Sequence, residues 1–342
     1  MSLPLSRRAF CRLIGSAVPL AVGPRAFSAP ADDDRNGLTL SIGNYGMQSH
    51  SVEKAIELVV EAGFDGMELS VMPDWSSAPT RLSTERRQSL RRQFADSGLA
   101  LNSLMEDLHP SAVEAEHQKT LDRLKQAAEL GRDLSPQKPP LIQTVLGGGK
   151  WDDKKGLFRD RLGDWMRLAE AQRTVVAVKP HRSGAMSQPA EAAWLFKQLG
   201  KSDWLGMVYD YSHYAFRELS IAQTVKFAFP FTVQIAVKDA VLRGDHVEFA
   251  LPGEANTIDY GEILSSFYRL GYRRDVCCEV SSQAFRAKEY DAAKATRWCY
   301  TSMQGVFEKS QIPRRRRNSR GRTNRDSVPP NCFARCANSD GL

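Results

Sequence analysis

The feature that most constrains this chain is a repeated order: a short apolar run is followed by a longer amphipathic stretch, eight times over. Runs that are β-branched and apolar on both faces are typical of a parallel sheet covered by helices. Eight such units fill roughly 275 residues, which fits a closed barrel better than an open doubly wound sheet. The glycine-rich phosphate-binding fingerprint of dinucleotide folds is missing after the first run. The sequence therefore predicts an α/β fold, a single-domain (β/α)8 TIM barrel.

The individual elements follow from the apolar runs and from the glycines that end helices. Gly63 and Gly98 each follow an amphipathic stretch, as expected at a helix C-terminus. The expected strands are residues 38–42, 64–71, 99–104, 141–146, 175–178, 206–209, 233–237 and 276–280. The expected helices are residues 49–62, 84–96, 112–130, 158–172, 189–199, 221–227, 260–270 and 292–308.

Residues 1–31 are typical of an export signal. Two arginines at 7–8 precede an apolar stretch at 13–23 and small residues at 29–31. A charged start, a short apolar core and a small-residue exit make up a secretory signal, and the paired arginines resemble a twin-arginine signal. The apolar stretch of about 11 residues is shorter than the roughly 20 that a membrane span needs. We therefore expect a twin-arginine signal over residues 1–31, a periplasmic or secreted protein, and no membrane span.

The C-terminal segment differs from the rest in composition. Four consecutive arginines at 314–317 are followed by a polar, proline-containing stretch to the end of the chain. Such a segment cannot bury enough apolar surface to offset the entropy lost on ordering. We therefore expect the barrel to span residues 36–311 and a basic disordered tail to span residues 312–342.

The positive charge of the chain is concentrated at its two ends. Of the formal net charge of +7, residues 1–31 contribute +4 and residues 313–342 contribute +6, so the intervening segment carries −3. A nucleic-acid-binding body normally presents a basic surface. The mildly acidic body argues against nucleic acid as a partner, and against the metal-dependent apurinic endonucleases as relatives in function.

Polar side chains accumulate at the C-terminal ends of the expected strands, which is where barrels of this kind carry their sites. One such residue alone is most often a helix cap or a solvated loop group. Convergence from at least five strands predicts a binding pocket. The residues in question are Glu68, Glu106, Asp107, His109, Lys179, His181, Arg182, Asp210, His213, Lys238, Asp239 and Glu279.

Several segments carry a family resemblance, which covers about residues 38–308. Residues 63–69, Gly-Phe-Asp-Gly-Met-Glu-Leu, resemble the second-strand signature of the xylose-isomerase-like sugar phosphate isomerase and epimerase superfamily. Residues 178–182, Val-Lys-Pro-His-Arg, resemble its fifth-strand Glu-Pro-His-Arg segment. Residues 210–213 match its Asp-x-x-His, and residues 237–239 match the end of its His-x-Lys-Asp strand. Its last βα unit is matched at residues 252–254, 258–260, 270–272 and 278–280.

The resemblance implies a metal-assisted proton transfer. In that superfamily one divalent cation (Mn²⁺, Mg²⁺ or Zn²⁺) is held by Glu, Asp, His and Glu from strands five to eight. It polarises a carbonyl and a hydroxyl while carboxylates move a proton between neighbouring carbons through an enediolate. Here Asp210 and Glu279 match, and they are the metal ligands if a metal is bound. Lys179 stands at the position of the strand-five Glu, and Ala236 at that of the strand-seven His.

Three interpretations of this altered centre follow. In the first, the protein is an enzyme in which the Lys179 ammonium replaces the metal, with Glu279 or His213 moving the proton. In the second, the barrel binds a sugar or polyol without chemistry, and Lys179 only forms salt bridges with Asp210 and Glu279. In the third, a metal still binds through Asp210, Glu279 and further ligands such as Glu68 or His181.

The sequence thus favours a carbohydrate or polyol isomerase or epimerase that acts by proton transfer through an enediolate, with an atypical, metal-depleted centre. The alternative is a catalytically inactive sugar-binding barrel. The expected catalytic residues are Lys179, Asp210, His213 and Glu279. The expected substrate-binding residues, which would hold hydroxyls or a carboxylate, are Glu68, His109, His181, Arg182 and Arg243. The expected partner is a small free sugar or polyol, and an oligomer is compatible with the sequence.

Overall fold

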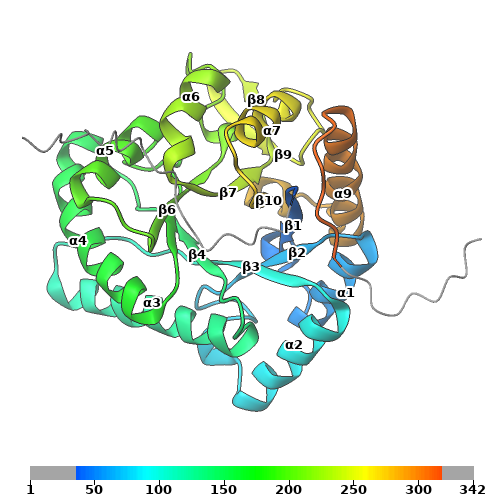
Figure 1. Cartoon of the computed structure of the whole chain (residues 1–342), viewed down its shortest axis with the longest axis horizontal. Helices are drawn as coiled ribbons and strands as arrows, with labels where there is room; N and C mark the ends of the chain where they lie inside the picture. The colour runs from blue at the N-terminus through cyan, green and yellow to red at the C-terminus, as the bar shows by residue number, and fades with distance from the viewer. Residues whose placement is uncertain (1–35, 318–342) are drawn as a thin grey trace, which may run out of the picture.

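The computed structural model describes residues 36–317, which form a closed barrel of parallel strands (Figure 1). Its strands are β1 (Thr39–Gly43), β2 (Gly66–Ser70), β3 (Ala100–Met105), β4 (Leu141–Thr144), β5 (Val176–Val178), β6 (Leu205–Tyr209), β7 (Thr232–Val237) and β10 (Asp275–Cys278). Their order around the barrel is β1-β10-β7-β6-β5-β4-β3-β2, so that β1 and β10 close the ring. The predicted TIM barrel is confirmed.

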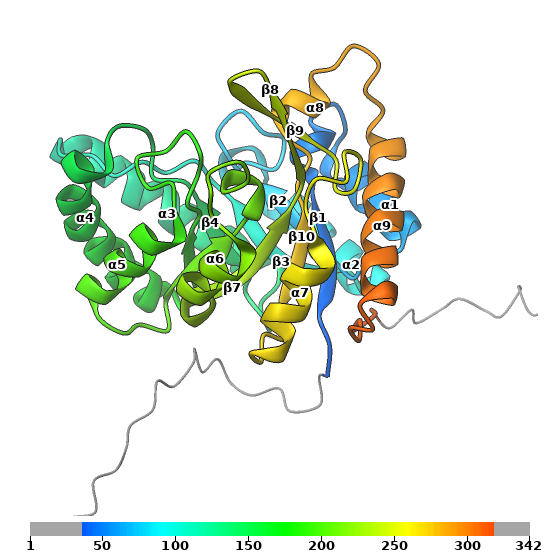
Figure 2. The same cartoon turned by 90° about the horizontal axis from the view of Figure 1, so that it is seen from above.

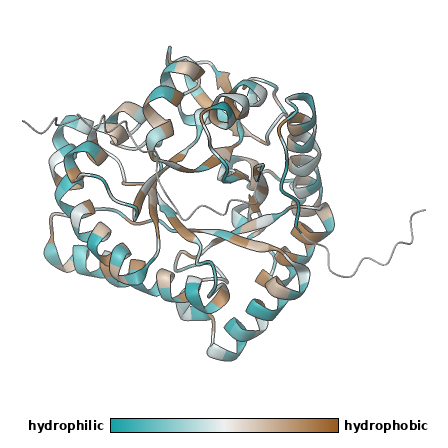
Figure 3. Cartoon of the chain, in the orientation of Figure 1, coloured by the Kyte–Doolittle hydropathy of each residue, from teal (hydrophilic) through white to brown (hydrophobic). Residues whose placement is uncertain are grey.

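A ring of helices covers the outside of the barrel. They are α1 (Val52–Ala62), α2 (Thr84–Ser97), α3 (Glu114–Leu134), α4 (Trp151–Gln172), α5 (Pro189–Leu199), α6 (Ile221–Ala228), α7 (Tyr260–Arg269) and α9 (Ala292–Lys309). Figure 3 shows hydrophilic residues on their outer faces, as amphipathic helices packed on a sheet require. None of the helices between residues 36 and 317 is long and apolar enough to cross a membrane.

Local signals set most helix ends close to their predicted positions. Ser51 accepts a hydrogen bond from the Lys54 N–H and caps α1, and Gly63, with φ of 100°, ends it. The largest difference from prediction is α4, which begins at Trp151. The acidic residues at 152–153 favour an earlier helix start because they face the positive end of the helix dipole.

A β-hairpin between β7 and α7 was not predicted. It comprises β8 (Asp239–Arg243) and β9 (His246–Ala250), which pair antiparallel. Gly244, with φ of 61°, and the next residue make the two-residue turn between them. The hairpin and the short helix α8 (Ser282–Phe285) rise above the C-terminal end of the barrel (Figure 2). Short 3-10 helices in the described chain are η1 (Asn44–Met47), η2 (Pro79–Arg81), η3 (Tyr211–His213) and η4 (Phe229–Phe231).

The predicted boundary of the basic tail is wrong at its start. Residues 312–317, here called the C-terminal strap, lie against the N-terminal end of the barrel, where Arg314 forms a β-bridge with Leu38. The Arg314 guanidinium is 4% exposed and donates to Asp65 Oδ2 at 2.6 Å and to the Gly63 carbonyl at 2.7 Å. Composition suggested disorder, but a buried arginine is stable when each donor meets an acceptor. Residues 318–342 and the expected signal at 1–31 lie outside the described residues.

Candidate active site

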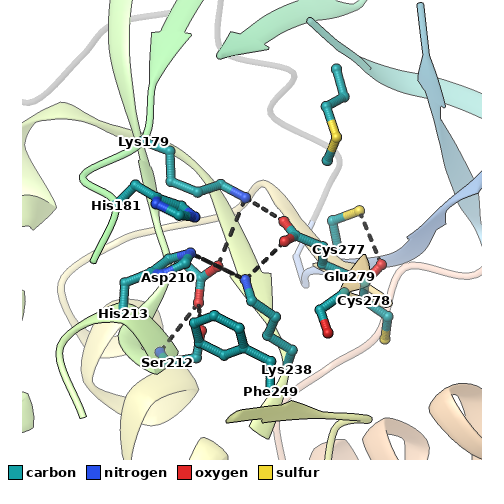
Figure 4. Close-up of polar contacts among 12 residues, drawn as sticks. Lys179, His181, Asp210, Ser212, His213, Lys238, Phe249, Cys277, Cys278 and Glu279 are labelled. Atoms are coloured by element: carbon teal, nitrogen blue, oxygen red, sulfur yellow. Dashed lines mark hydrogen bonds and ion pairs between the residues drawn. The ribbon is translucent and has the colours of Figure 1, made fainter. Parts of the chain in front are cut away.

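Four charged side chains meet at the C-terminal end of the barrel. Lys179, Asp210, Lys238 and Glu279 each directly follow the last residue of a strand, namely β5, β6, β7 and β10. Because the strands are parallel, their ends open on one side and these side chains converge, as Figure 4 shows. Asp210 is 0% exposed, Lys238 1%, Lys179 4% and Glu279 13%. The centre is therefore almost closed to solvent, and Glu279 is its most accessible member.

The two lysines hold the two carboxylates in different ways. Lys238 Nζ donates to Asp210 Oδ2 at 2.5 Å and to Glu279 Oε1 at 2.9 Å. Lys179 Nζ donates to Glu279 Oε2 and lies 3.8 Å from Asp210 Oδ2. The hydroxyl of Ser212 donates to Asp210 Oδ1 at 2.6 Å. Two positive and two negative groups thus balance within one buried cluster.

The contacts within the cluster fix the ionisation of Lys179 and Glu279. Burial by itself would lower the pKa of Lys179, but the carboxylates of Glu279 and Asp210 outweigh it, and the pKa is raised. Burial by itself would raise the pKa of Glu279, but Lys179 and Lys238 hold that pKa well below its usual range. At neutral pH Lys179 is therefore an ammonium group and Glu279 a carboxylate, and Glu279 is a weak base.

Two histidines lie beside these charges, and both are neutral at pH 7. Lys238 Nζ lies 3.3 Å from His213 Nε2, and that nitrogen accepts from the ammonium group in the tautomer that carries its hydrogen on Nδ1. Burial and the charge of Lys238 hold the pKa of His213 well below its usual value. The ring of His181 lies 4.0 Å from that of His213, centroid to centroid, and burial with the charges of Lys238 and Lys179 lowers the pKa of His181 to about 4. His213, predicted as a proton carrier, has its basic nitrogen occupied.

Glu68 is a carboxylate outside this ion-pair network. It is buried on β2, where Oε2 accepts from Ser103 Oγ at 2.6 Å and from Gln143 Nε2 at 2.7 Å. Burial raises the pKa of Glu68 to about 7, although the charge of Lys179 acts in the opposite direction. A carboxyl group with that pKa can both accept and donate a proton near neutral pH.

The other predicted substrate-binding residues lie at the edge of the cluster or away from it. His109 is half exposed and pairs with Asp107 Oδ1 at 2.9 Å. Arg182 donates to a main-chain carbonyl in the loop after β6. Arg243 ends β8 on the hairpin, where its side chain is 64% exposed and faces Glu248. Arg243 thus lies at the tip of a hairpin that was not predicted, and its substrate-binding role stays a prediction.

Three residues of this region were missed as site candidates. Lys238 was noted only as a polar residue after strand seven, yet it contacts both central carboxylates. Phe249 lies on β9 with its ring centroid 5.1 Å from Lys238 Nζ. Alternating apolar and polar residues on both sides of a Gly-Asp turn could have predicted the hairpin that carries it. Tyr45, from η1, stacks on Trp75 at 5.1 Å, and burial together with the charge of Glu279 raises the pKa of Tyr45.

The four ligand positions that the family resemblance implies contain two carboxylates. Asp210 and Glu279 fill two of them, and the ammonium group of Lys179 stands at the third. Ala236, the fourth, packs in a small apolar cluster and offers only a methyl group. Across residues 36–317, no three His, Cys, Asp or Glu side chains form a group suited to a metal ion.

An α/β barrel whose charged residues gather where its strands end has the site architecture of a TIM-barrel enzyme. The family described as "Xylose isomerase-like TIM barrel" matches residues 56–301, and the chain belongs to that family. The resemblance predicted from the sequence motifs is thereby confirmed. No curated protein matches the sequence.

Solved structures of low sequence identity share the fold. A "xylose isomerase-like TIM barrel/4-hydroxyphenylpyruvate dioxygenase fusion protein" is 19% identical with a TM-score of 0.64; the match covers 80% of this chain but 43% of the fusion, so the chain spans less than half of it. The "IOLI protein with a binding zinc atom" is 17% identical with a TM-score of 0.67, and the match covers 80% of this chain and 99% of that one. An L-ribulose 3-epimerase is 17% identical with a TM-score of 0.62, and the match covers 80% of this chain and 96% of that one.

Proposed function

We propose that this chain is a carbohydrate or polyol isomerase or epimerase that moves a proton through an enediolate, with lysine in place of a metal ion. The observation that carries the proposal is the convergence of Lys179 and Lys238 on Asp210 and Glu279 at the C-terminal mouth of the barrel. It is supported by the likeness of the fold to that of an L-ribulose 3-epimerase. Permanent positive charge at that place is what a developing oxyanion requires.

The substrate class follows from the chemistry of the centre. A carbonyl group next to a carbon that bears hydrogen and hydroxyl has an acidic C–H bond, and its enolate places negative charge on oxygen. The Lys179 ammonium can donate to that oxygen, because it is permanently protonated and lies beside the most accessible carboxylate, Glu279. Donors held in a dry site stabilise such charge more than donors in water.

Glu68 is the proton carrier that we assign. Its carboxylate takes the proton from carbon, and the carbonyl oxygen becomes the enediolate oxygen beside Lys179. The carboxyl O–H exchanges with solvent, and the group then returns a proton, or a deuteron in D₂O, to the neighbouring carbon. The hydroxyl proton moves between the two oxygens, so that the carbonyl changes place and no atom is lost. The pKa of Glu68, raised to about 7 by burial, suits this exchange, whereas the pKa of Glu279 is held too low.

The donor set does not fit a divalent cation. Two ammonium groups already neutralise the two carboxylates, and a metal ion beside them would meet like charge. We therefore include metal independence in the proposal and route no step through a metal. With an export signal at residues 1–31, the protein would meet free sugars rather than sugar phosphates, and that location is part of the proposal.

The second candidate is an inactive barrel that binds a sugar or polyol. The balance of charges favours it, because two lysines and two carboxylates can form a set of salt bridges with no further role. Burial of such pairs is common without catalysis.

Deuterium exchange distinguishes these two functions, because it detects the proton transfer whichever sugar is formed. The full-length protein is incubated in D₂O and EDTA with a panel of free aldoses, ketoses and cyclic keto-polyols, and proton NMR follows deuterium at the carbon next to the carbonyl. Exchange in EDTA supports the proposal. Exchange that appears only with added Mn²⁺ or Zn²⁺ rejects metal independence. Saturable binding without exchange establishes the inactive barrel, and neither binding nor exchange rejects both.

A further inference from the structure

The two central lysines use their hydrogen-bond donors differently. An ammonium group has three N–H donors. Lys238 Nζ lies 2.5 Å from Asp210 Oδ2, 2.9 Å from Glu279 Oε1 and 3.3 Å from His213 Nε2. Two carboxylate oxygens and, with the imidazole hydrogen on Nδ1, the His213 nitrogen take its three hydrogens. These acceptors come from two segments, residues 210–213 and the residue after β10, and the Phe249 ring lies against the same ammonium group. Lys238 has no donor left for a substrate.

Lys179, in contrast, has N–H donors that no acceptor among residues 36–317 uses. Its Nζ donates to Glu279 Oε2, while Asp210 Oδ2, at 3.8 Å, is beyond hydrogen-bond distance. Two of its three hydrogens are therefore uncommitted within the described part of the chain. Lys179 is the lysine that can face a substrate oxygen, and Lys238 is the one that holds the surrounding side chains.

We infer that Lys238 is a built-in cation: its ammonium group takes the place of a divalent metal ion, and its removal opens a metal site made of Asp210, His213 and Glu279. With Lys238 in place, no such group suited to a metal ion is present among residues 36–317, but two carboxylates and one imidazole nitrogen are a donor set that Zn²⁺ and Mn²⁺ accept. The role assigned to Lys179 rests on the proposed function, whereas the metal site is independent of any turnover.

Charge and space explain why the wild-type chain would not bind a metal there. A divalent ion would enter a neutral cluster and would have to displace Lys238 from three acceptors. Lys238→Ala removes one positive charge, frees the three acceptors and empties the volume of the lysine side chain. Lys179→Ala removes the same charge but leaves the Lys238 ammonium in place, so it is the matched control.

Metal content and thermal unfolding test this inference. Full-length wild type, Lys238→Ala, Lys179→Ala and the double variant are stripped with EDTA, dialysed against Zn²⁺ or Mn²⁺, and measured by elemental analysis and by Tm. We expect no stoichiometric metal and no saturable rise in Tm for wild type or Lys179→Ala. Lys238→Ala should bind one ion per chain with a saturable rise in Tm. The double variant should bind at least tenfold more tightly, since the last like charge is gone.

Several results would overturn the inference. The first is that the wild type binds one metal ion per chain and Asp210→Asn abolishes that binding. The second is that Lys238→Ala folds but binds no metal. The third is that Lys238→Ala and Lys179→Ala gain the same amount of metal. If Lys238→Ala does not fold in EDTA or in Zn²⁺, the small, neutral Lys238→Ser takes its place and must bind the ion. Metal gain by the Lys238 variant in a protein whose wild type shows no proton exchange would reject the proposed function alone.

Discussion

Two buried acid–base clusters lie at opposite ends of the same barrel, and they differ in how completely their donors are used. At the N-terminal end, Arg314 donates to Asp65, to Gly63, and to the side chains of Tyr300 and Gln304, so that every nitrogen of the guanidinium has an acceptor. At the C-terminal end, Lys179 donates to one carboxylate oxygen and keeps two hydrogens uncommitted.

The difference separates a structural role from a chemical one. A buried ion pair in which every nitrogen of the guanidinium already has an acceptor can fix two segments relative to each other but has little left to bind. An ion pair with an unused N–H donor differs, because folding has already removed that donor from water. A ligand oxygen can then accept its hydrogen bond without a further desolvation cost for the donor. The N-terminal cluster should therefore matter for stability, and the C-terminal cluster for activity.

The largest expected effect is on stability at the N-terminal cluster. Arg314→Met leaves the buried carboxylate of Asp65 without its cation, and the free energy of unfolding should fall by about 3–5 kcal/mol. Urea titration of the full-length protein measures it, with Arg92→Ala, exposed on α2, as a control that stays within about 0.5 kcal/mol. An Arg314→Met protein as stable as wild type would remove the structural half of the comparison.

The next effect is on catalysis at the C-terminal cluster. Lys179→Met removes the uncommitted donor, and the rate of deuterium exchange should fall by about 10²–10³-fold, as for the loss of one oxyanion donor. Lys125→Met, an exposed change on α3, is the matched control and should keep the wild-type rate. Exchange by Lys179→Met at the wild-type rate would show that the spare donor is not used.

A smaller effect is expected on the pH dependence of stability, through Glu68. Burial raises the pKa of Glu68 from 4.5 to about 7, so the folded chain retains a proton that the unfolded chain releases within that interval. This contribution is fully present below pH 4.5 and is lost as the pH rises to about 7. Since one pKa unit corresponds to about 1.4 kcal/mol, the stability of wild type relative to Glu68→Gln should fall by about 3 kcal/mol across the interval.

Unfolding titrations at pH 4 and pH 8 measure this difference, with Glu61→Gln, exposed on α1, as the control that shows none. The exchange rate of the wild type should rise with pH through about 7, because the carboxylate form is the base, and Glu68→Gln should lose that dependence. An unchanged pH profile in Glu68→Gln would assign the proton carrier elsewhere.

The sequence predicted the barrel because periodicity along the chain reports which residues are buried. The four residues that directly follow β5, β6, β7 and β10 were all visible as polar residues at strand ends. Their roles were not visible, since the count of donors on Lys238 and Lys179 depends on distances that join three segments. The motif match at residues 237–239 directed attention to the missing histidine at 236 rather than to the lysine beside it.

Two other features have a common reason for having been missed. The hairpin that carries Arg243 was not predicted, and Arg314 was assigned to a disordered tail from the composition of its neighbours. Both depend on tertiary contacts: a turn at Gly244 places Arg243 at the tip of the hairpin, and a β-bridge to Leu38 holds Arg314 against the barrel. Local sequence does not determine such contacts.

The bridge between Leu38 and Arg314 also has a practical consequence. It brings both ends of the described chain to the face opposite the charged mouth, where Leu38 and Arg314 are paired by backbone hydrogen bonds. An affinity tag, a fluorophore or a linker to a solid support joined near either position would leave the mouth open to substrate. The same proximity makes the barrel a candidate for circular permutation, in which residues 38 and 314 are joined and new termini are cut at an exposed loop.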